Sequence, residues 1–219
     1  MLLVCIGKAT KLAETLQKEG KEYLAGVSFG ATTPSYDLEK AIDQEYPVEG
    51  VTEESVREVL PRFLGEQEQI APLFSAKSVD GVRAYELARK QYREAHKEKT
   101  DVMTDFDHTV AETLNKQIIN ISGMELISFF PNGKESGPEL SDEGLRPNPR
   151  INVVDTSALH LPLAMIWIKC SKGTYIRALA RDLGEALGSG AHLNSLERTK
   201  SGGFTVGNCL SVNEVISVL

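Results

Sequence analysis

An apolar segment, Leu163–Cys170, leads directly into a glycine turn and then into a helical pattern, and this strand–turn–helix unit constrains the fold most strongly. An apolar run of this length bounded by turn residues is typical of a strand inside a sheet. Thr174 precedes the helical pattern as a candidate N-cap, and Gly188 follows Leu187 as its stop. This unit therefore predicts a strand at residues 163–170 and a helix through Leu187.

Other segments carry strand or helix patterns. We expect further strands at residues 1–6, 23–29, 70–76 and 117–130, and helices at residues 9–16, 52–63, 83–90 and after the capping box of Ser211 and Glu214. Strands and helices follow one another without a regular βαβ repeat, and we find no internal repeat. The order therefore predicts one α+β domain spanning residues 1–219.

Two stretches look inserted into this pattern, and the first segment starts abruptly. Residues 91–115 are charged with few apolar positions, and residues 131–156 are rich in Pro, Gly, Asn and Ser, as surface loops are. Residues 1–6 form an apolar run with no polar lead-in. We interpret this start as a sign that the sequence begins inside the fold, because a core strand needs neighbours on both edges.

Charge is segregated along the chain, although a net charge of −7 does not by itself indicate a nucleic-acid binder. Acidic side chains dominate residues 37–68, whereas basic side chains dominate residues 169–200. A polyanion would therefore meet the C-terminal third of the chain. On charge alone, a solvated acidic face beside an ordinary basic helix remains the alternative.

Spacing argues against several common kinds of site. The segment Gly7-Lys-Ala-Thr10 lacks the second glycine and the adjoining Ser or Thr of a phosphate-binding loop. The cysteines at 5, 170 and 209 lie far apart, which indicates no disulfide framework and favours a reducing compartment. The four histidines lack metal-ligand spacing, so we expect no metal. No stretch has the length of a membrane span or the pattern of a signal peptide, and we expect no membrane partner.

The most informative segment for function is Cys170-Ser-Lys-Gly-Thr-Tyr-Ile-Arg177. The positive end of a helix, Lys172 and Arg177 together form a corner that attracts anions. An aromatic side chain such as Tyr175 can contact or stack on a base at such a corner. A structural turn that carries a surface arginine is the alternative for this segment taken alone.

This segment, with Asp182-Leu-Gly184 and with Gly190-Ala-His-Leu193 leading to Leu196-x-Arg-Thr199, resembles the C-terminal core of the TruB family of tRNA pseudouridine synthases. Upstream segments agree in the family's order. They are GKATK at 7–11, KEY at 21–23 before FG at 29–30, and FSA at 74–76 before Gly81 and AYELAR at 84–89. The resemblance covers nearly the whole chain apart from the two insertions, and several motifs in one order are more specific than any single motif.

The resemblance implies a pseudouridine-synthase fold, with a mixed, largely antiparallel sheet flanked by helices. It implies isomerisation of uridine to pseudouridine in RNA without a cofactor, typically at uridine-55 in the T-arm of tRNA. The base is flipped out because its reacting atoms are inaccessible within the folded arm, and an aspartate acts as nucleophile. We expect RNA as the partner, and the resemblance leaves open whether the substrate is tRNA, mRNA or both. We expect the protein to be a monomer. The compartment, cytoplasmic or organellar, stays open.

The resemblance also implies roles for individual residues. Tyr23 matches the tyrosine that stacks on the flipped uracil, and Tyr175 matches the active-site tyrosine near C5. Arg177 matches the arginine that pairs with the catalytic aspartate, and Leu196 matches an apolar wall of the uracil pocket. Asp37 falls where the family often has an acidic residue that braces the site. Further substrate contacts are expected from the basic residues Lys11, Lys172 and Arg198.

One departure from the family concerns the nucleophile itself. In the family a Gly-x-Leu-Asp-x-x-Ala-x-Gly loop holds it directly before the strand leading to Gly-x-Ala-Thr-Lys, and here Met1 stands immediately after the place of that loop. We therefore expect a partial catalytic domain without the first strands, without the nucleophile and without a C-terminal RNA-binding extension. A catalytically dead RNA-binding module and a plain α+β interaction protein are the alternatives. An in-frame copy of the loop upstream in the gene would distinguish the enzyme from the dead module.

Overall fold

The computed structural model describes residues 1–72, 78–79, 82–83, 116–133 and 153–218. The strands are β1 (Lys21–Phe29), β2 (Ala31–Thr32), β3 (Gln44–Glu45), β4 (Gly65–Gln69), β5 (Ser78–Val79), β6 (Val82–Arg83), β7 (Gln117–Phe130), β8 (Leu163–Cys170), β9 (Ala191–Ser201) and β10 (Phe204–Thr205). The helices are α1 (Ala13–Lys18), α2 (Glu53–Val59), α5 (Ile176–Leu187) and α6 (Val212–Val218). Turns of 3-10 helix span Gly7–Leu12, Leu60–Phe63, Ser157–Leu159 and Val206–Asn208.

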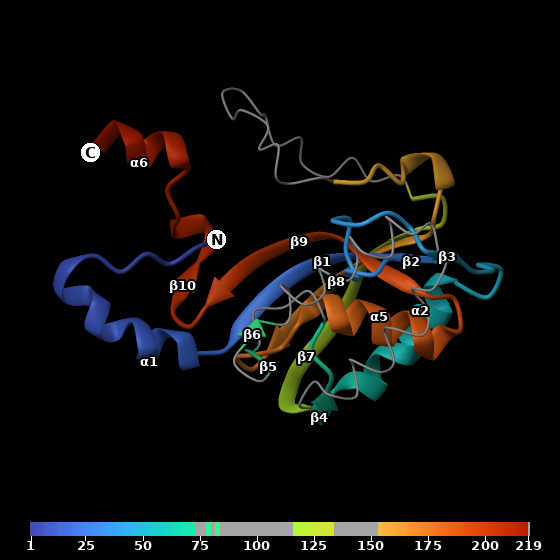
Figure 1. Ribbon diagram of the computed structural model, residues 1–219, viewed down its shortest axis with the longest axis horizontal. Helices are drawn as coiled ribbons and strands as arrows, with labels where there is room; N and C mark the ends of the chain where they lie inside the picture. Colours follow the sequence, from blue (N-terminus) through green and yellow to red (C-terminus); the bar gives the residue numbers. More distant parts are fainter. Residues whose placement is uncertain (73–77, 80–81, 84–115, 134–152, 219) are drawn as a thin grey trace.

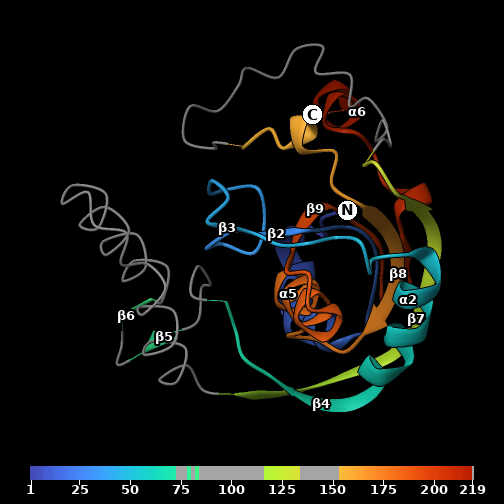
Figure 2. The same ribbon diagram turned by 90° about the vertical axis from the view of Figure 1, so that its right-hand side faces the viewer.

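A six-stranded sheet forms the body of the protein, in the order β10-β9-β1-β8-β7-β4 (Figure 1). Its strand pairs are antiparallel, as are those of the small β2-β3 and β5-β6 sheets. The sheet curves around α5, as Figure 2 shows from one end. The expected α+β fold with a largely antiparallel sheet is confirmed.

Strand β1 lies at the centre of this sheet because both of its edges are paired. It pairs with β8 on one side and with β9 on the other, over nearly its full length. The strand expected at residues 23–29 is confirmed, and Ala25 and the following residues of β1 are buried on both faces. Helix α5 covers one face, and residues near Leu161 and Leu163 cover the other.

The hydrophobic core lies between the sheet and α5. Alternate residues of β1, including Val27 and Phe29, point toward the helix, whose Leu179 and Leu183 are almost completely buried. Helix and strand backbones touch at Gly184, where an added Cβ would lie 2.2 Å from the Ala191 backbone nitrogen. The close contact therefore requires a residue without a side chain.

Several sequence predictions are confirmed. The apolar run Leu163–Cys170 is β8, residues 117–130 are β7, and helical structure spans residues 7–18. Thr52 and Ser55 form a capping box at the start of α2, and helical structure continues from there to Phe63. The Ser211–Glu214 capping box precedes α6, and α5 ends at Gly188 with a φ of 67°.

Four predictions about secondary structure were wrong or incomplete. Residues 1–6 form no strand, because no strand among the described residues pairs with them, and Leu2, Val4 and Ile6 are at least 72% exposed. Residues 70–72 are not part of a strand. Strand β4 ends at Gln69, because Gln69 pairs with Gln117 and Gln117 is the first residue of β7.

The other two errors concern the region around α5. Thr174 is not the N-cap, since its hydroxyl donates to the Ser171 carbonyl and Tyr175 takes the cap position instead. Strand β9 was not predicted at all, because much of it is polar or exposed and its place in the sheet comes from pairing with β1.

The remaining expectations fall largely outside the described residues. Arg83 belongs to β6 rather than to a helix, and residues 84–90 of that expected helix are outside the described ranges. The insertion at 91–115 is outside them too. Of the insertion at 131–156, the described residues 131–133 and 153–156 are turn or irregular structure.

Replacing Gly184 tests the contact between helix and strand. Gly184→Ala should lower the free energy of unfolding by about 1–3 kcal/mol, because an overpacked interface must shift backbone atoms. This cost exceeds the gain of roughly 1 kcal/mol that alanine brings to a helix interior. Gly50→Ala is the matched control, since nothing lies within 4 Å of its added Cβ. Chemical denaturation measures both, and a Gly184→Ala variant more stable than the wild type would contradict the packing.

Candidate functional site

The start of α5 is fixed by a buried side chain from the far edge of the sheet. Gln69, the last residue of β4, is only 2% exposed. Its Oε1 accepts a hydrogen bond from the Tyr175 backbone N–H at 2.9 Å, and its Nε2 donates to the Tyr175 carbonyl at 3.2 Å. Both polar ends of the amide are therefore used to position the residue that precedes α5. Sequence reasoning missed Gln69, because nothing local marks it.

Arg177 in the first turn of α5 forms an ion pair with Asp37. Its Nη1 lies 2.9 Å from Asp37 Oδ2 and 3.4 Å from the Ser35 carbonyl oxygen, and both charged side chains are about three quarters buried. Asp37 is itself fixed, since it forms a parallel bridge with Leu193 and its carbonyl accepts from the Thr33 hydroxyl at 2.6 Å. The resemblance gave Asp37 a bracing role, and its carboxylate lies within hydrogen-bond distance of the guanidinium of Arg177.

A second arginine, one helical turn later, holds the same loop. The guanidinium carbon of Arg181 lies 4.9 Å from the ring centroid of Tyr36, within the range of a cation–π contact. Tyr36 adopts a φ of 60°, a conformation that is costly for a bulky residue and needs support from its surroundings. Two arginines of α5 therefore hold the loop that carries Asp37. The sequence did not predict the Tyr36–Arg181 contact.

Asp182 completes this charged group. Its Oδ1 accepts hydrogen bonds from Arg181 Nη2 at 2.5 Å and from Nε at 2.8 Å. Burial lowers the pKa of Arg181, but the Asp182 carboxylate and Tyr36 together outweigh it, so that the pKa of Arg181 is raised. Burial likewise raises the pKa of Asp182, while the arginine opposes that rise. The Arg181–Asp182 pair lies against the ring of Tyr36.

Tyr23 and Leu196 come from neighbouring strands on the face that α5 covers. In the register of β1 with β9, Tyr23 lies opposite Arg198 and Ala25 lies opposite Leu196. Directly opposed residues of antiparallel strands point to the same face, and Tyr23 packs against the core beneath α5. Leu196 is 47% exposed, which is high for a large apolar side chain beside a tyrosine. An aromatic ring and an exposed leucine on one face form a surface on which a flat base can lie.

Arg198 has two partners in this arrangement. Burial raises the pKa of the Tyr23 phenol, and a hydrogen bond from the Arg198 side chain opposes the rise. Arg198 also donates to the Met1 carbonyl oxygen from Nη2, at 2.7 Å, and from Nε, at 3.2 Å. These hydrogen bonds thus join Arg198 of β9 to the first residue of the chain, and the expected substrate contact of Arg198 stays a prediction.

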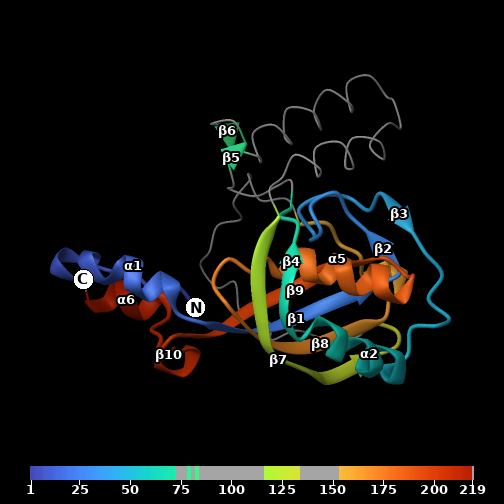
Figure 3. The ribbon, with the colours of Figure 1, turned by 90° about the horizontal axis from the view of Figure 1, so that it is seen from below.

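The two lysines expected to contact substrate lie in different places. Lys172 is exposed in the turn that leads to Tyr175, beside the start of α5. Lys11 belongs to the 3-10 turn Gly7–Leu12, which extends with α1 beyond the end of the sheet and away from α5 (Figure 3). The structure therefore brings Lys172 to the corner and leaves Lys11 apart from it.

His192 of β9 is a buried titratable group close to the loop that carries Asp37. The side chain has no exposed surface, and its Nδ1 lies 2.9 Å from the Ala31 carbonyl oxygen. Nδ1 must therefore carry the proton, while Nε2 has no hydrogen-bond partner among the described residues. Burial lowers the pKa of His192, so the ring is neutral at pH 7.

In the described parts of the chain, no cluster of three or more His, Cys, Asp and Glu side chains could hold a metal ion. No helix in those parts is long and apolar enough to span a membrane.

The titration of His192 can be tested through stability. A buried histidine with a lowered pKa takes up its proton in the unfolded chain first, so stability falls as pH drops below about 6.5, by up to about 1.4 kcal/mol per pH unit. His192→Asn keeps an N–H donor for Ala31 and does not titrate, so this fall between about pH 6.5 and 5 should become shallower. His160→Asn, at an exposed position, is the control and should keep the wild-type slope. Urea denaturation at several pH values measures how steeply the free energy of unfolding changes with pH. Equal slopes in the wild type and both variants would refute the assignment.

Comparison with known proteins supplies the family. The model of the TruB family pseudouridylate synthase N-terminal domain matches residues 1–125, and the model of the tRNA pseudouridylate synthase B C-terminal domain matches residues 177–219. The tRNA pseudouridine synthase B of Phocaeicola vulgatus is 42% identical over 212 residues, which are 97% of this chain and 70% of that protein. That of Bacteroides thetaiotaomicron is 44% identical over 210 residues, 96% of this chain and 69% of that protein.

Solved structures support the fold. A Cbf5-Nop10-Gar1 complex contains a chain that matches with a TM-score of 0.54 at 19% identity, over 97% of this chain and 40% of that one. An H/ACA RNP bound to a substrate RNA containing 2'-deoxyuridine matches with a TM-score of 0.51 at 17% identity, over 97% and 38%. With its motifs, its fold and these relatives in agreement, the chain belongs to the TruB family of pseudouridylate synthases.

Proposed function

We propose that this chain functions as a tRNA pseudouridine synthase, which isomerises uridine to pseudouridine and has uridine-55 of the T-arm as its target. The observation that supports this most is the shared face of Tyr23 and Leu196 under α5, the helix that begins with Tyr175 and Arg177. These are the four residues to which the family resemblance gives roles at the flipped uracil. Relatives up to 44% identical carry the name tRNA pseudouridine synthase B.

In this proposal Tyr23 and Leu196 bind the extruded base. The half-buried tyrosine ring offers a stacking surface, and the exposed leucine offers an apolar wall that a base would cover. Because Tyr23 packs against the core and lies opposite Arg198 in the neighbouring strand, the ring is held in place before the base arrives. Such preorganisation favours binding, since less side-chain freedom is lost.

Tyr175 and Arg177 act at the reacting centre. Arg177 would pair with the nucleophilic aspartate, and the opposite charge would keep that carboxylate ionised. Asp37 serves as a positioning residue, because its ion pair orients the guanidinium. Tyr175 lies next to C5 of the uracil, where a proton must leave before pseudouridine is complete. Gln69 supports this role, since it fixes the backbone of Tyr175.

The residues that this chain contributes to the site all come from a single sheet and the helix packed on it. We therefore propose that the protein acts as a monomer, with one tRNA arm bound at a time. RNA stem-loops of the same shape in mRNA form the second class of substrate in this proposal.

The uracil-stacking role of Tyr23 can be measured by binding. Tyr23→Ala should weaken binding of a T-arm stem-loop by about 1–3 kcal/mol, because one base–aromatic stack is lost. Tyr23→Phe keeps the ring and should bind within about twofold of the wild type. Fluorescence anisotropy with a labelled stem-loop gives both affinities. Equal affinity of Tyr23→Ala and wild type would remove Tyr23 from the site.

The nucleophile is tested by activity. No aspartate of this chain stands in the Gly-x-Leu-Asp-x-x-Ala-x-Gly context, so residues 1–219 alone should form no pseudouridine. The chain extended at its N-terminus by a relative's segment with this loop should form it, and the same extension with Asp→Asn should not. Tritium release from 5-tritiated uridine in a tRNA transcript measures turnover. An active extended chain supports the enzyme, and an inactive one that still binds the stem-loop supports the alternative of a non-catalytic RNA-binding module.

A further inference from the structure

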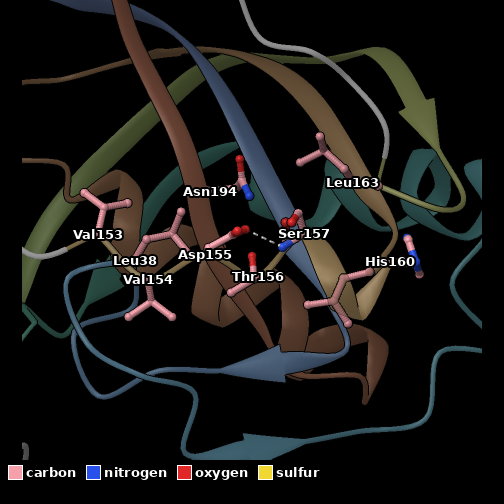
Figure 4. Close-up of a pocket in the computed structure, with 12 residues that line it drawn as sticks. Leu38, Val153, Val154, Asp155, Thr156, Ser157, His160, Leu163 and Asn194 are labelled. Carbon is pink, nitrogen blue, oxygen red and sulfur yellow. Dashed lines mark hydrogen bonds between the residues drawn. The ribbon is translucent and has the colours of Figure 1, made fainter.

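A cavity lies on the face of the sheet opposite α5, and the catalytic proposal makes no use of it. Its volume is about 350 Å³, and its walls include Ser28 of β1, Leu163 of β8 and Asn194 of β9 (Figure 4). Residues 153–157, which lie upstream of β8, line its outer side, where Asp155 and Ser157 are exposed. Ser28 alternates along β1 with Val27 and Phe29, which point into the core beneath α5, so the cavity is on the other face.

The outer wall of the cavity is held at both ends by backbone hydrogen bonds. The Val154 N–H donates to the Leu38 carbonyl at 2.9 Å, and the Phe29 N–H donates to the Pro162 carbonyl at 2.9 Å. Between these anchors, Asp155 Oδ1 accepts from the Ser157 N–H at 2.9 Å. The carboxylate is thus fixed in orientation, and hydrogen bonds from Ser157 lower the pKa of Asp155, so it is charged at neutral pH.

Asn194 is directed by an irregularity of β9. Gly26 pairs with Ser195 and Val27 pairs with Leu193, so Asn194 has no residue opposite it in β1. A bulge of this kind changes the direction of the extra residue's side chain. Figure 4 shows the Asn194 amide, the Asp155 carboxylate and Ser157 gathered between Leu38 and Leu163.

The lining favours one class of ligand. The volume is at the small end of those that bind organic ligands, which suits a nucleoside. Among the described residues, the lining contains a carboxylate and no Lys or Arg, so it does not favour a phosphate. An aspartate accepts from the exocyclic amine of cytosine, and an asparagine amide pairs with the amine and the ring nitrogen of adenine. Leucines on either side suit the faces of a flat ring.

We propose that this cavity binds an amino-bearing nucleobase, with Asp155 and Asn194 as the groups that read the amine and Leu38 and Leu163 as the apolar walls. The base is that of a free nucleoside or an unpaired adenine or cytosine of a bound RNA. The site lies on the face opposite Tyr23 and Leu196, so it is distinct from the proposed uracil surface. Binding of a free nucleoside does not depend on the proposed enzymatic function.

Pairs of nucleosides that differ in the amine test the proposal on the whole chain. Adenosine and cytidine, titrated against the 15N-labelled protein, should shift the amide signals around Asp155 and Asn194. Inosine and uridine, which carry a carbonyl in place of the amine, should bind roughly 5- to 150-fold more weakly. Asp155→Asn keeps the acceptor for the Ser157 N–H and loses the charge, and it should weaken adenosine and cytidine binding. Glu66→Gln, an exposed carboxylate on β4, is the control and should leave binding unchanged.

A second arm identifies the source of the base. T-arm stem-loops with each unpaired adenine or cytosine replaced by purine riboside or 4-deoxy-cytidine analogues are measured against wild type and Asp155→Asn. If the wild type loses affinity for the analogue stem-loops and Asp155→Asn does not, the ligand is a base of the RNA. If the protein binds nucleosides but the analogue stem-loops bind as before, the ligand is a free nucleoside. Inosine and uridine binding as tightly as their amino counterparts, or no response in either arm, overturns the proposal. Tyr23→Ala separates the two sites, because it should weaken capture of uridine in RNA and leave adenosine binding intact.

Discussion

The contact on which the rest of the structure depends is the packing of α5 inside the curve of the sheet. Leu179 and Leu183 fill the space over β1, and Gly184 lets the helix backbone touch that of β9. Once this contact is made, the first turn of α5 is fixed relative to the end of β1 where Tyr23 lies. The functional groups are therefore positioned by core packing, which is dense and tolerates little displacement.

Polar contacts further fix the position of α5 relative to the sheet. Gln69 fixes the start of α5 from one side of the sheet, and the Arg177–Asp37 pair ties its first turn to a loop on the other side. Tyr36 needs support for its unusual backbone conformation, and Arg181 supplies it from the next turn of the same helix. Because these contacts span the whole width of the sheet, a shift of the helix would disturb Tyr175, Arg177 and Asp37 together.

Much of this fold could be predicted from the sequence where the signal is local. Strands β7 and β8 and helix α2 follow from hydrophobic patterning and capping residues within their own segments. Strand β9 could not be predicted in this way, since its exposed half carries residues such as Ser195 and Glu197 and its pairing partner lies far away in sequence. The error at residues 1–6 has the same cause: an apolar run indicates that a strand is possible, and a partner decides whether it forms.

The residues of the candidate site also fall into those with a local sequence signal and those without one. Tyr23, Tyr175, Arg177 and Leu196 were identified because they lie in motifs that can be compared along the chain. Gln69 was missed although it touches Tyr175, since the two are 106 positions apart and only the folded sheet joins them. Tyr36 and Arg181 were missed for the same reason.

The sheet separates two surfaces that share its central strand. On one face of β1, odd-numbered residues from Tyr23 to Phe29 lead from the proposed uracil surface into the core. On the other face, Ser28 lines a cavity whose outer side is formed by residues 153–157. A ligand in that cavity would contact β1, β8 and β9 at once, and these are the strands that carry Tyr23 and Leu196 or lead into α5. The two faces therefore share paired strands, and a coupling between ligands on the two faces would be reciprocal in free energy.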